Sequence, residues 1–239
     1  MRIIIFIFSL VSCTAFAKSV EPKLKITQLA DNVYQHVSYK KTKTWGMVGA
    51  SGLVVVIGTD AYIIDTPWTQ KSTEQLISWI KSENLNLKAA VITHFHEDAS
   101  GGIPFLNNLK VKTYATSMTN NLLGNKKREK SSNEISRDTF ELVDNTIEVF
   151  YPGAGHTRDN IVVWLPKHKI LFGGCFVIST RSKSLDNIED ASVEDWPKSI
   201  QRVINKYPEI EVVVPGHGKV GDESLLNHTA KLGLGAKGL

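Results

Sequence analysis

The stretch Val91-Ile92-Thr93-His94-Phe95-His96-Glu97-Asp98-Ala99-Ser100-Gly101-Gly102 begins as an apolar run and ends in polar residues and paired glycines. This order is typical of a buried strand that runs out into a loop and then into a helix. Alternate residues of an extended chain point the same way, so His94, His96 and Asp98 are expected to converge on one side of the loop. Two imidazoles and a carboxylate suit Zn²⁺ or another borderline metal. The competing interpretation is a strand end with incidental histidines, because short motifs recur by accident.

Length and charge limit the classes of protein to consider. The 239 residues suit one large α/β domain or two small ones. A formal net charge of +4 does not predict a nucleic-acid partner, which needs a stronger basic excess on one face. Because no repeat, low-complexity segment or long linker divides the chain, we expect a single domain over residues 18–239.

Residues 1–17 are similar to a secretory signal peptide. Arg2 precedes an apolar run from Ile3 to Val11, and Ala15-Phe16-Ala17 offers a small-x-small cleavage pattern. The run is too short to span a bilayer. We therefore expect a soluble periplasmic protein that begins at Lys18 and makes no stable membrane insertion.

The two cysteines bear on the same question. Leu10-Val11-Ser12-Cys13 resembles the lipobox of bacterial lipoproteins, which would instead leave a lipid anchor on Cys13. Cleavage after Ala17 leaves Cys175 as the remaining cysteine, so no internal disulfide can form. A lone thiol in an exported protein is a liability unless it is buried or bound.

Apolar runs separated by turn residues predict an α/β chain. We expect strands at 53–57, 61–64, 113–115, 140–143, 147–150, 161–165, 169–172 and 212–214, with one or two more in 24–38, and helices at 69–83, 103–106, 117–123, from about 195, and from about 222. His156, Cys175 and His217 each follow an apolar strand or lie in a Gly-rich loop. Strand ends are where open α/β sheets collect ligand-binding residues.

Several other polar residues receive provisional interpretations. Residues 39–46 are predicted to be a loop, with Trp45 either covering a ligand or packing on its own hairpin. Asp65 is a candidate acceptor for the N–H of a ligand histidine, or a residue that bonds its own loop. The charge run at 126–130 is predicted to be a solvated loop. His36, His168 and His228 match no motif and are assigned no role.

The motifs taken in order resemble the dizinc metallo-beta-lactamases of class B. The pieces that carry the resemblance are HFHEDASGG at 94–102, GAGHT at 153–157, GGC at 173–175 and PGHG at 215–218, supported by DTPW at 65–68 and NIEDA at 187–191. The resemblance covers nearly all of the chain after the signal. It implies an α/β fold, the four-layer αβ/βα sandwich, in which two sheets pack face to face with helices outside. It also implies a site at one edge of that sandwich.

The resemblance further implies an activity and its residues. Two zinc ions per chain would be held by one set of ligands each, His94, His96 and His156 for the first and Asp98, Cys175 and His217 for the second. A metal-bound hydroxide would hydrolyse the lactam amide of β-lactam antibiotics and confer antibiotic resistance. Asp98 would pass a proton to the leaving nitrogen, and Asn187 would help polarise the carbonyl. The family suggests a monomer.

The substrate carboxylate is where this chain departs from its relatives. Many of them carry a lysine three residues after the cysteine ligand, and here that position is Ile178. Arg181 and Lys183 follow, and Arg181 is preferred because a guanidinium can grip a carboxylate with two parallel hydrogen bonds. In the alternative both are solvent-exposed loop charges, and the second zinc alone holds the carboxylate. Trp45 is a further candidate for substrate contact.

Two other function classes compete. One is another hydrolase of the same fold that cleaves a thioester, lactone or phosphodiester. Such relatives usually carry a histidine after the aspartate, where this chain has Ala99, and an aspartate that bridges their metals, where it has Cys175. The other is a non-catalytic zinc-binding protein, which six ligands with two open coordination positions disfavour.

Overall fold

The structure, a computed structural model, describes residues 22–236. The predicted signal peptide and Cys13 lie outside these residues. The larger of two sheets has seven strands, in the order β1 (Lys25–Ala30), β2 (Val33–Thr42), β3 (Gly46–Ile57), β4 (Asp60–Ile64), β5 (Asn86–Val91), β6 (Lys112–Thr116) and β7 (Asn133–Ile135). The smaller has five, in the order β12 (Val212–Pro215), β11 (Ile170–Gly174), β10 (Val162–Leu165), β9 (Ile147–Phe150) and β8 (Thr139–Val143).

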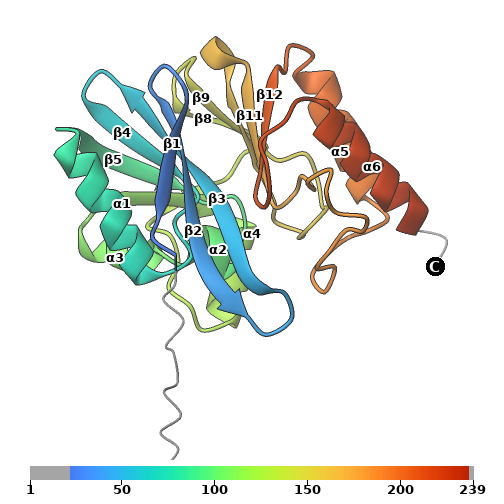
Figure 1. Cartoon of the computed structure of the whole chain (residues 1–239), viewed down its shortest axis with the longest axis horizontal. Coiled ribbons are helices and arrows are strands. Elements are labelled where there is room, and N and C mark those ends of the chain that lie inside the picture. Colours follow the sequence, from blue (N-terminus) through green and yellow to red (C-terminus); the bar gives the residue numbers. More distant parts are fainter. Residues whose placement is uncertain (1–21, 237–239) are drawn as a thin grey trace, which may run out of the picture.

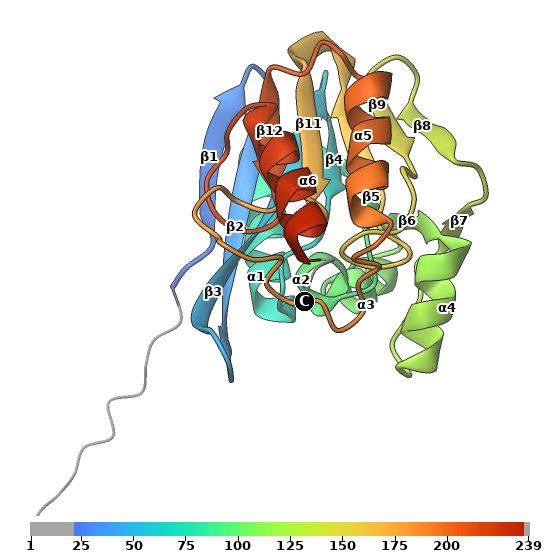
Figure 2. The same cartoon turned by 90° about the vertical axis from the view of Figure 1, so that its right-hand side faces the viewer.

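Helices cover the outer faces of both sheets. They are α1 (Gln70–Ser82), α2 (Glu97–Ser100), α3 (Ile103–Asn108), α4 (Ser117–Asn125), α5 (Trp196–Lys206) and α6 (Ser224–Ala236), with a 3-10 turn at Pro166–His168. Figure 1 shows α1 and α3 on one side of the paired sheets and α5 and α6 on the other. Figure 2, turned by 90°, places α5 and α6 in front of the smaller sheet. Within residues 22–236, no helix is both long and apolar enough to cross a membrane.

The alternation of side chains along the strands explains the layers. In β3, Leu53 and Val55 pack in a core shared by both sheets, whereas Val54 and Val56 pack against α1. In β10, Val163 also lies in the shared core, and Trp164 packs with α5 and α6. Because successive residues of a strand face opposite ways, strands that are apolar throughout serve two cores at once. This confirms the predicted four-layer αβ/βα sandwich.

The predicted loop at 39–46 is wrong in extent. Strands β2 and β3 pair from Val33 and Val55 out to Thr42 and Gly46, which leaves only residues 43–45 in the turn. Strand β1 pairs with β2 only as far as Val37. Beyond that point β2 and β3 form a two-stranded ribbon that extends past the sheet. Such a ribbon needs no apolar face, so its polar sequence resembles that of a loop.

Candidate metal centre

Strand β5 delivers the first two histidines. After Val91 the chain leaves the strand, and Ile92 still donates to Tyr114 O of β6 at 2.9 Å. The Thr93 amide and hydroxyl both donate to the Asp65 carboxylate, each at 2.7 Å. The Thr93 hydroxyl oxygen lies 3.2 Å from His94 Nδ1. Asp65 therefore reaches the His94 ring through Thr93, rather than directly as the sequence suggested. Burial raises the pKa of Asp65 to about 7, although His94 and the hydrogen bonds from Thr93 oppose the shift.

Asp98 reaches the centre from a helix rather than from extended chain. Helix α2 begins at Glu97, and its four residues place Asp98 in the first turn. The expected alternation of His94, His96 and Asp98 along an extended segment is therefore wrong after His96. The convergence itself is right, because the helical turn brings Asp98 Oδ1 to 3.5 Å from His94 Nε2.

Cys175 and His217 come from the smaller sheet. Strands β11 and β12 pair in parallel, so their carboxyl ends meet at the same edge and place Cys175 beside His217. A Cβ atom on Gly216 would lie 2.5 Å from Cys175 Sγ, so only glycine permits this approach. His217 Nδ1 donates to Gly49 O of β3 at 2.8 Å, which ties this loop to the larger sheet.

His156 lies in the loop between β9 and β10. Asn160 folds this loop onto itself, because its side-chain oxygen accepts from Thr157 N at 3.0 Å and its nitrogen donates to Gly153 O at 3.0 Å. Both Thr157 and Asn160 are buried. These two hydrogen bonds fix the course of the loop and hold the His156 ring against the histidines of the larger sheet.

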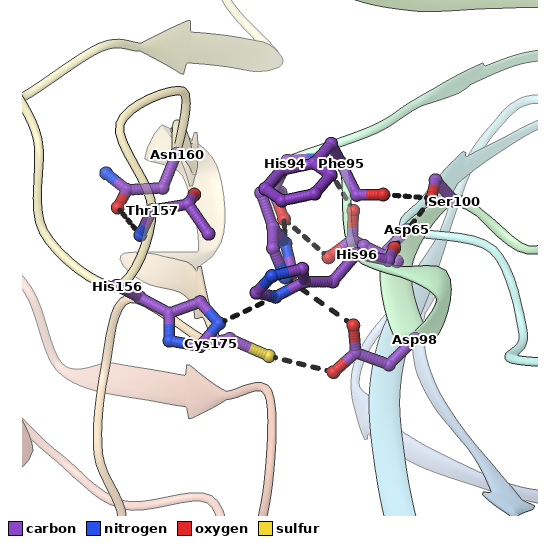
Figure 3. A network of polar contacts seen from close by, with 12 residues as sticks. Asp65, His94, Phe95, His96, Asp98, Ser100, His156, Thr157, Asn160 and Cys175 are labelled. Atoms are coloured by element: carbon purple, nitrogen blue, oxygen red, sulfur yellow. Dashed lines mark hydrogen bonds and ion pairs between the residues drawn. The ribbon is translucent and has the colours of Figure 1, made fainter. Parts of the chain in front are cut away.

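The structure brings all six predicted ligands together in overlapping sets of three. Figure 3 shows His94, His96, His156, Asp98 and Cys175 turned toward one another. We divide the six ligands into the imidazole group, formed by His94, His96 and His156, and the mixed group, formed by Asp98, Cys175 and His217. The three rings of the imidazole group have centroids 5.0 to 5.2 Å apart. In the mixed group, Asp98 Oδ2 lies 3.0 Å from His217 Nε2 and 3.3 Å from Cys175 Sγ.

The pKa shifts differ between the two groups, with His94 as the exception in the imidazole group. Burial would lower the pKa of His94, but hydrogen bonding to Asp98 outweighs it and raises the pKa. Burial and the neighbouring histidines lower the pKa of His156 well below its usual value. Burial and the charge of His94 also lower the pKa of His96. In the mixed group, burial and Asp98 raise the pKa of the Cys175 thiol well above its usual value. Burial would lower the pKa of His217, but hydrogen bonding to Asp98 outweighs it and raises the pKa. For Asp98 burial is outweighed by His217 and His94, which hold the pKa well below its usual range.

A cavity of about 460 Å³ opens over both groups. Five of the six predicted ligands line it, and His94 lies buried behind them. Of the predicted substrate contacts, Trp45, Arg181 and Asn187 line the cavity and Lys183 does not. Trp45 is 57% exposed at the tip of the β2–β3 hairpin and lines the cavity.

Comparison with known proteins places this arrangement in a family. Residues 45–217 match the metallo-beta-lactamase superfamily. The chain belongs to the metallo-beta-lactamase superfamily. It is 45% identical over 208 residues to a metallo-beta-lactamase type 2 of Pseudomonas aeruginosa, covering 87% of this chain and 83% of the relative. A metallo-beta-lactamase type 2 of Bacteroides fragilis is 37% identical over 216 residues, covering 89% and 86%.

Solved structures of the family agree with the fold. The crystal structure of VMB-1 at pH 5.5 superposes with a TM-score of 0.89 at 61% identity, over 90% of this chain and 98% of that one. The metallo-beta-lactamase FIM-1 from Pseudomonas aeruginosa, in its mono-zinc form, gives a TM-score of 0.86 at 32% identity, over 90% and 97%.

The donor set of this chain fits zinc. His94 Nε2 and Asp98 Oδ1 face each other across 3.5 Å, both buried, and neither has a hydrogen-bond partner within residues 22–236. Buried polar atoms normally find partners, so two such atoms that point into a cluster of donors suit a bound cation. Imidazoles, one thiolate and one carboxylate form the mixture of soft and borderline ligands that zinc prefers.

Sequence reasoning missed two residues that support the ligands. Asp190 Oδ2 accepts from His96 Nε2 at 2.9 Å, which orients that ring with Nδ1 toward His156. Arg128, predicted to be part of a solvated charge run, is half-buried and donates to Phe95 O at 2.7 Å and to Ser100 Oγ at 2.9 Å. Asp190 lies within the NIEDA motif, which was a usable signal. Arg128 had none, because a basic residue among four other charges is usually solvated.

Proposed function

We propose that this chain is a zinc-dependent β-lactamase that hydrolyses the lactam amide of β-lactam antibiotics and thereby confers resistance to them. The imidazole group holds one zinc ion and the mixed group holds the other. The observation that supports this most is the convergence of six donors from both sheets beneath one open cavity, in a chain that belongs to the metallo-beta-lactamase superfamily.

The protein residues bind, orient and move protons around the scissile bond. Bound zinc supplies a water made acidic enough to act as a nucleophile at neutral pH, together with positive charge near the carbonyl. Water adds to the carbonyl carbon, the C–N bond breaks, and the nitrogen takes up a proton. Asp98 Oδ2, within 3.0 Å of His217 and at the edge of the cavity, is placed to relay that proton. Asn187 lines the same cavity, and its amide donates to the carbonyl oxygen.

Arg181 binds the carboxylate that lies next to the lactam nitrogen. Ile178 is buried and cannot replace the lysine of many relatives, whereas Arg181 is exposed toward the cavity. Arg181→Ala should lower kcat/KM by roughly 1.5–3 kcal/mol of transition-state stabilisation, the range for a charge-assisted hydrogen bond. Most of the loss should appear in KM, because the carboxylate is bound in ground and transition states alike. Lys183→Ala is the matched control and should change little; a large loss there instead would transfer the role to Lys183.

Trp45 covers the bound substrate at the cavity. It is the aromatic residue at the tip of the β2–β3 ribbon, and it lines the same cavity as Asn187. An indole ring provides a large apolar surface for a β-lactam side chain. Trp45→Ala should raise KM with little change in kcat.

The export route is part of the proposal. Arg2, the apolar run that follows it and Ala15-Phe16-Ala17 support cleavage after Ala17, with residues 18–239 as a single periplasmic, monomeric domain. The intact mass of the protein from its native host tests this. A mass that begins at Lys18 supports it, and a lipid-modified Cys13 contradicts it.

One assay tests the activity. Purified, zinc-loaded protein is incubated with a penicillin, a carbapenem, a thioester and a lactone, each with and without a chelator. The proposal expects hydrolysis of the β-lactams that the chelator abolishes. Faster cleavage of the thioester or lactone would indicate another hydrolase of this fold. If no substrate is cleaved, the chain is a non-catalytic zinc-binding protein.

A further inference from the structure

The segment Ile178–Ser182 forms the cavity wall that carries Arg181. It lies between Cys175 and Asn187 in neither helix nor strand, although Ile178, Arg181 and Ser182 all line the cavity. Without a ladder of backbone hydrogen bonds, the position of such a segment depends on individual contacts.

Two adjacent residues of α6 hold the two ends of this segment. At the first end, Ile178 N donates to Thr229 Oγ1 at 2.9 Å. At the other end, His228 Nε2 lies 3.0 Å from Ser182 O. A carbonyl oxygen only accepts, so the His228 ring must carry its proton on Nε2. Thr229 is fully buried and its hydroxyl donates to Leu225 O at 2.7 Å, so this anchor is itself fixed.

The residues between the anchors form a turn. Ser182 N donates to Ser179 O at 2.9 Å, which encloses Arg181 in a four-residue turn. Ser179 packs against the backbone of Gly218, where a Cβ atom would lie 2.6 Å from Ser179 Oγ. Ser182 thus closes the turn that presents Arg181, and His228 holds the carbonyl of the closing residue.

We propose that His228 is a positioning residue for Arg181, acting through Ser182 O to fix the orientation of the guanidinium toward the substrate carboxylate. The inference rests on the proposed function, since it deepens the role given to Arg181. A bidentate contact requires the guanidinium in one plane and one place. Without the anchor, the turn must be ordered when the substrate binds, and that cost weakens binding rather than slowing the chemical step.

The decisive comparison is His228→Leu against His228→Gln. Both remove the ring, but Gln keeps a nitrogen donor at the same number of bonds from Cα and Leu does not. In His228→Leu we expect faster hydrogen exchange in residues 179–186 and a KM for a carboxylate-bearing penicillin about 3- to 10-fold higher, with kcat nearly unchanged. His228→Gln should stay close to wild type on both measures. Zinc content should be equal in all three proteins.

Two further variants separate positioning from general stability. His168→Leu removes a histidine beyond the far end of β11 from Cys175 and should change neither exchange in 179–186 nor KM. In an Arg181→Ala background, His228→Leu should leave KM as it is, because the residue it positions is gone.

Particular results overturn the inference. Equal exchange and equal KM in the Leu and Gln variants would show that the hydrogen bond to Ser182 does not hold the turn. An increase in KM that persists in the Arg181→Ala background would show that His228 acts on something other than Arg181. Absence of β-lactam hydrolysis by the wild type would refute the proposed function instead, and the exchange comparison would still decide whether His228 holds the segment.

Discussion

The imidazole group and the mixed group share an edge of the sandwich but prepare for a metal in opposite ways. His96 and His156 have lowered pKa values because burial and neighbouring rings disfavour extra protons. Cys175 and His217 have raised pKa values, because burial keeps the thiol protonated and Asp98 stabilises the imidazolium. Apart from His94, whose pKa is raised, the imidazole group therefore offers free lone pairs, whereas Cys175 and His217 of the mixed group favour their protonated forms. A zinc ion has to displace those protons from the mixed group.

Asp98 connects the two groups, so its removal should have the largest effect. It lies 3.5 Å from His94 Nε2 and 3.0 Å from His217 Nε2. Asp98→Asn keeps the shape and removes the charge. We expect kcat/KM to fall by more than the roughly 10- to 100-fold typical of losing a residue that only orients a ligand. Zinc content and steady-state kinetics measure this, with Asp144→Asn in the exposed β8–β9 turn as control. If Asp98→Asn still binds two zinc ions tightly and has near-normal kinetics, then Asp98 does not connect the two groups.

Cys175→Ser should separate the groups. A neutral hydroxyl replaces the thiolate of the mixed group and leaves the imidazole group intact, so roughly one tight zinc of two should remain. Cys175 is the free cysteine of the structure and is buried. A zinc titration followed by calorimetry measures the number of zinc ions bound per chain. If the variant binds two zincs as tightly as wild type does, Cys175 is not a ligand.

Asp190→Asn should affect the imidazole group alone. Asp190 accepts from His96 Nε2 and so fixes the ring whose Nδ1 lies 3.1 Å from His156 Nε2. Loss of such an orienting carboxylate typically costs about 10- to 100-fold in metal affinity. The neighbouring Glu189→Gln is the matched control, since its side chain is exposed and the structure of residues 22–236 shows no ion pair between it and a predicted ligand. If Asp190→Asn instead weakens zinc binding in the mixed group and leaves the imidazole group unchanged, then Asp190 supports the mixed group and the prediction is wrong.

The smallest expected difference between the two groups is in how their zinc affinity depends on pH. At neutral pH the mixed group must release protons from Cys175 and His217, whose pKa values are raised, whereas in the imidazole group only His94 has a raised pKa. Each displaced proton makes affinity rise about tenfold per pH unit. Affinity should therefore increase with pH in both groups, and more steeply in the mixed group.

Competition with a chromophoric chelator between about pH 6.5 and 8 measures both slopes. The tightly bound zinc of Cys175→Ser gives the pH dependence of zinc affinity for the imidazole group. The second zinc of the wild type gives it for the mixed group. Equal slopes would mean that the two groups hold the same number of protons before zinc arrives.

Local sequence patterns predicted most of the fold. Apolar runs such as Leu53 to Ile57 gave the buried strands, because a strand between two cores needs apolar side chains on both faces. Strand β7 (Asn133–Ile135) was missed, since three residues at a sheet edge carry no periodic signal. The outer part of the β2–β3 ribbon has the sequence of a loop because most of residues 41–47 are exposed. Where no core imposes a pattern, the sequence leaves secondary structure undetermined.

The identity of the six donors was determined by the sequence itself. Histidine, cysteine and aspartate are the residue types that zinc coordination uses, and the six predicted ligands lie just past apolar strands or in Gly-rich loops. The supporting contacts were decided by tertiary structure alone. His96 meets Asp190 94 residues away, and His228 meets Ser182 46 residues away. Side-chain chemistry favoured Arg181 over Lys183, but only the tertiary structure puts Arg181, and not Lys183, in the lining of the cavity. A hydrogen bond between distant segments leaves no regular spacing of residues in the sequence. The direction of a loop side chain leaves none either, so both features are specified only by the folded structure.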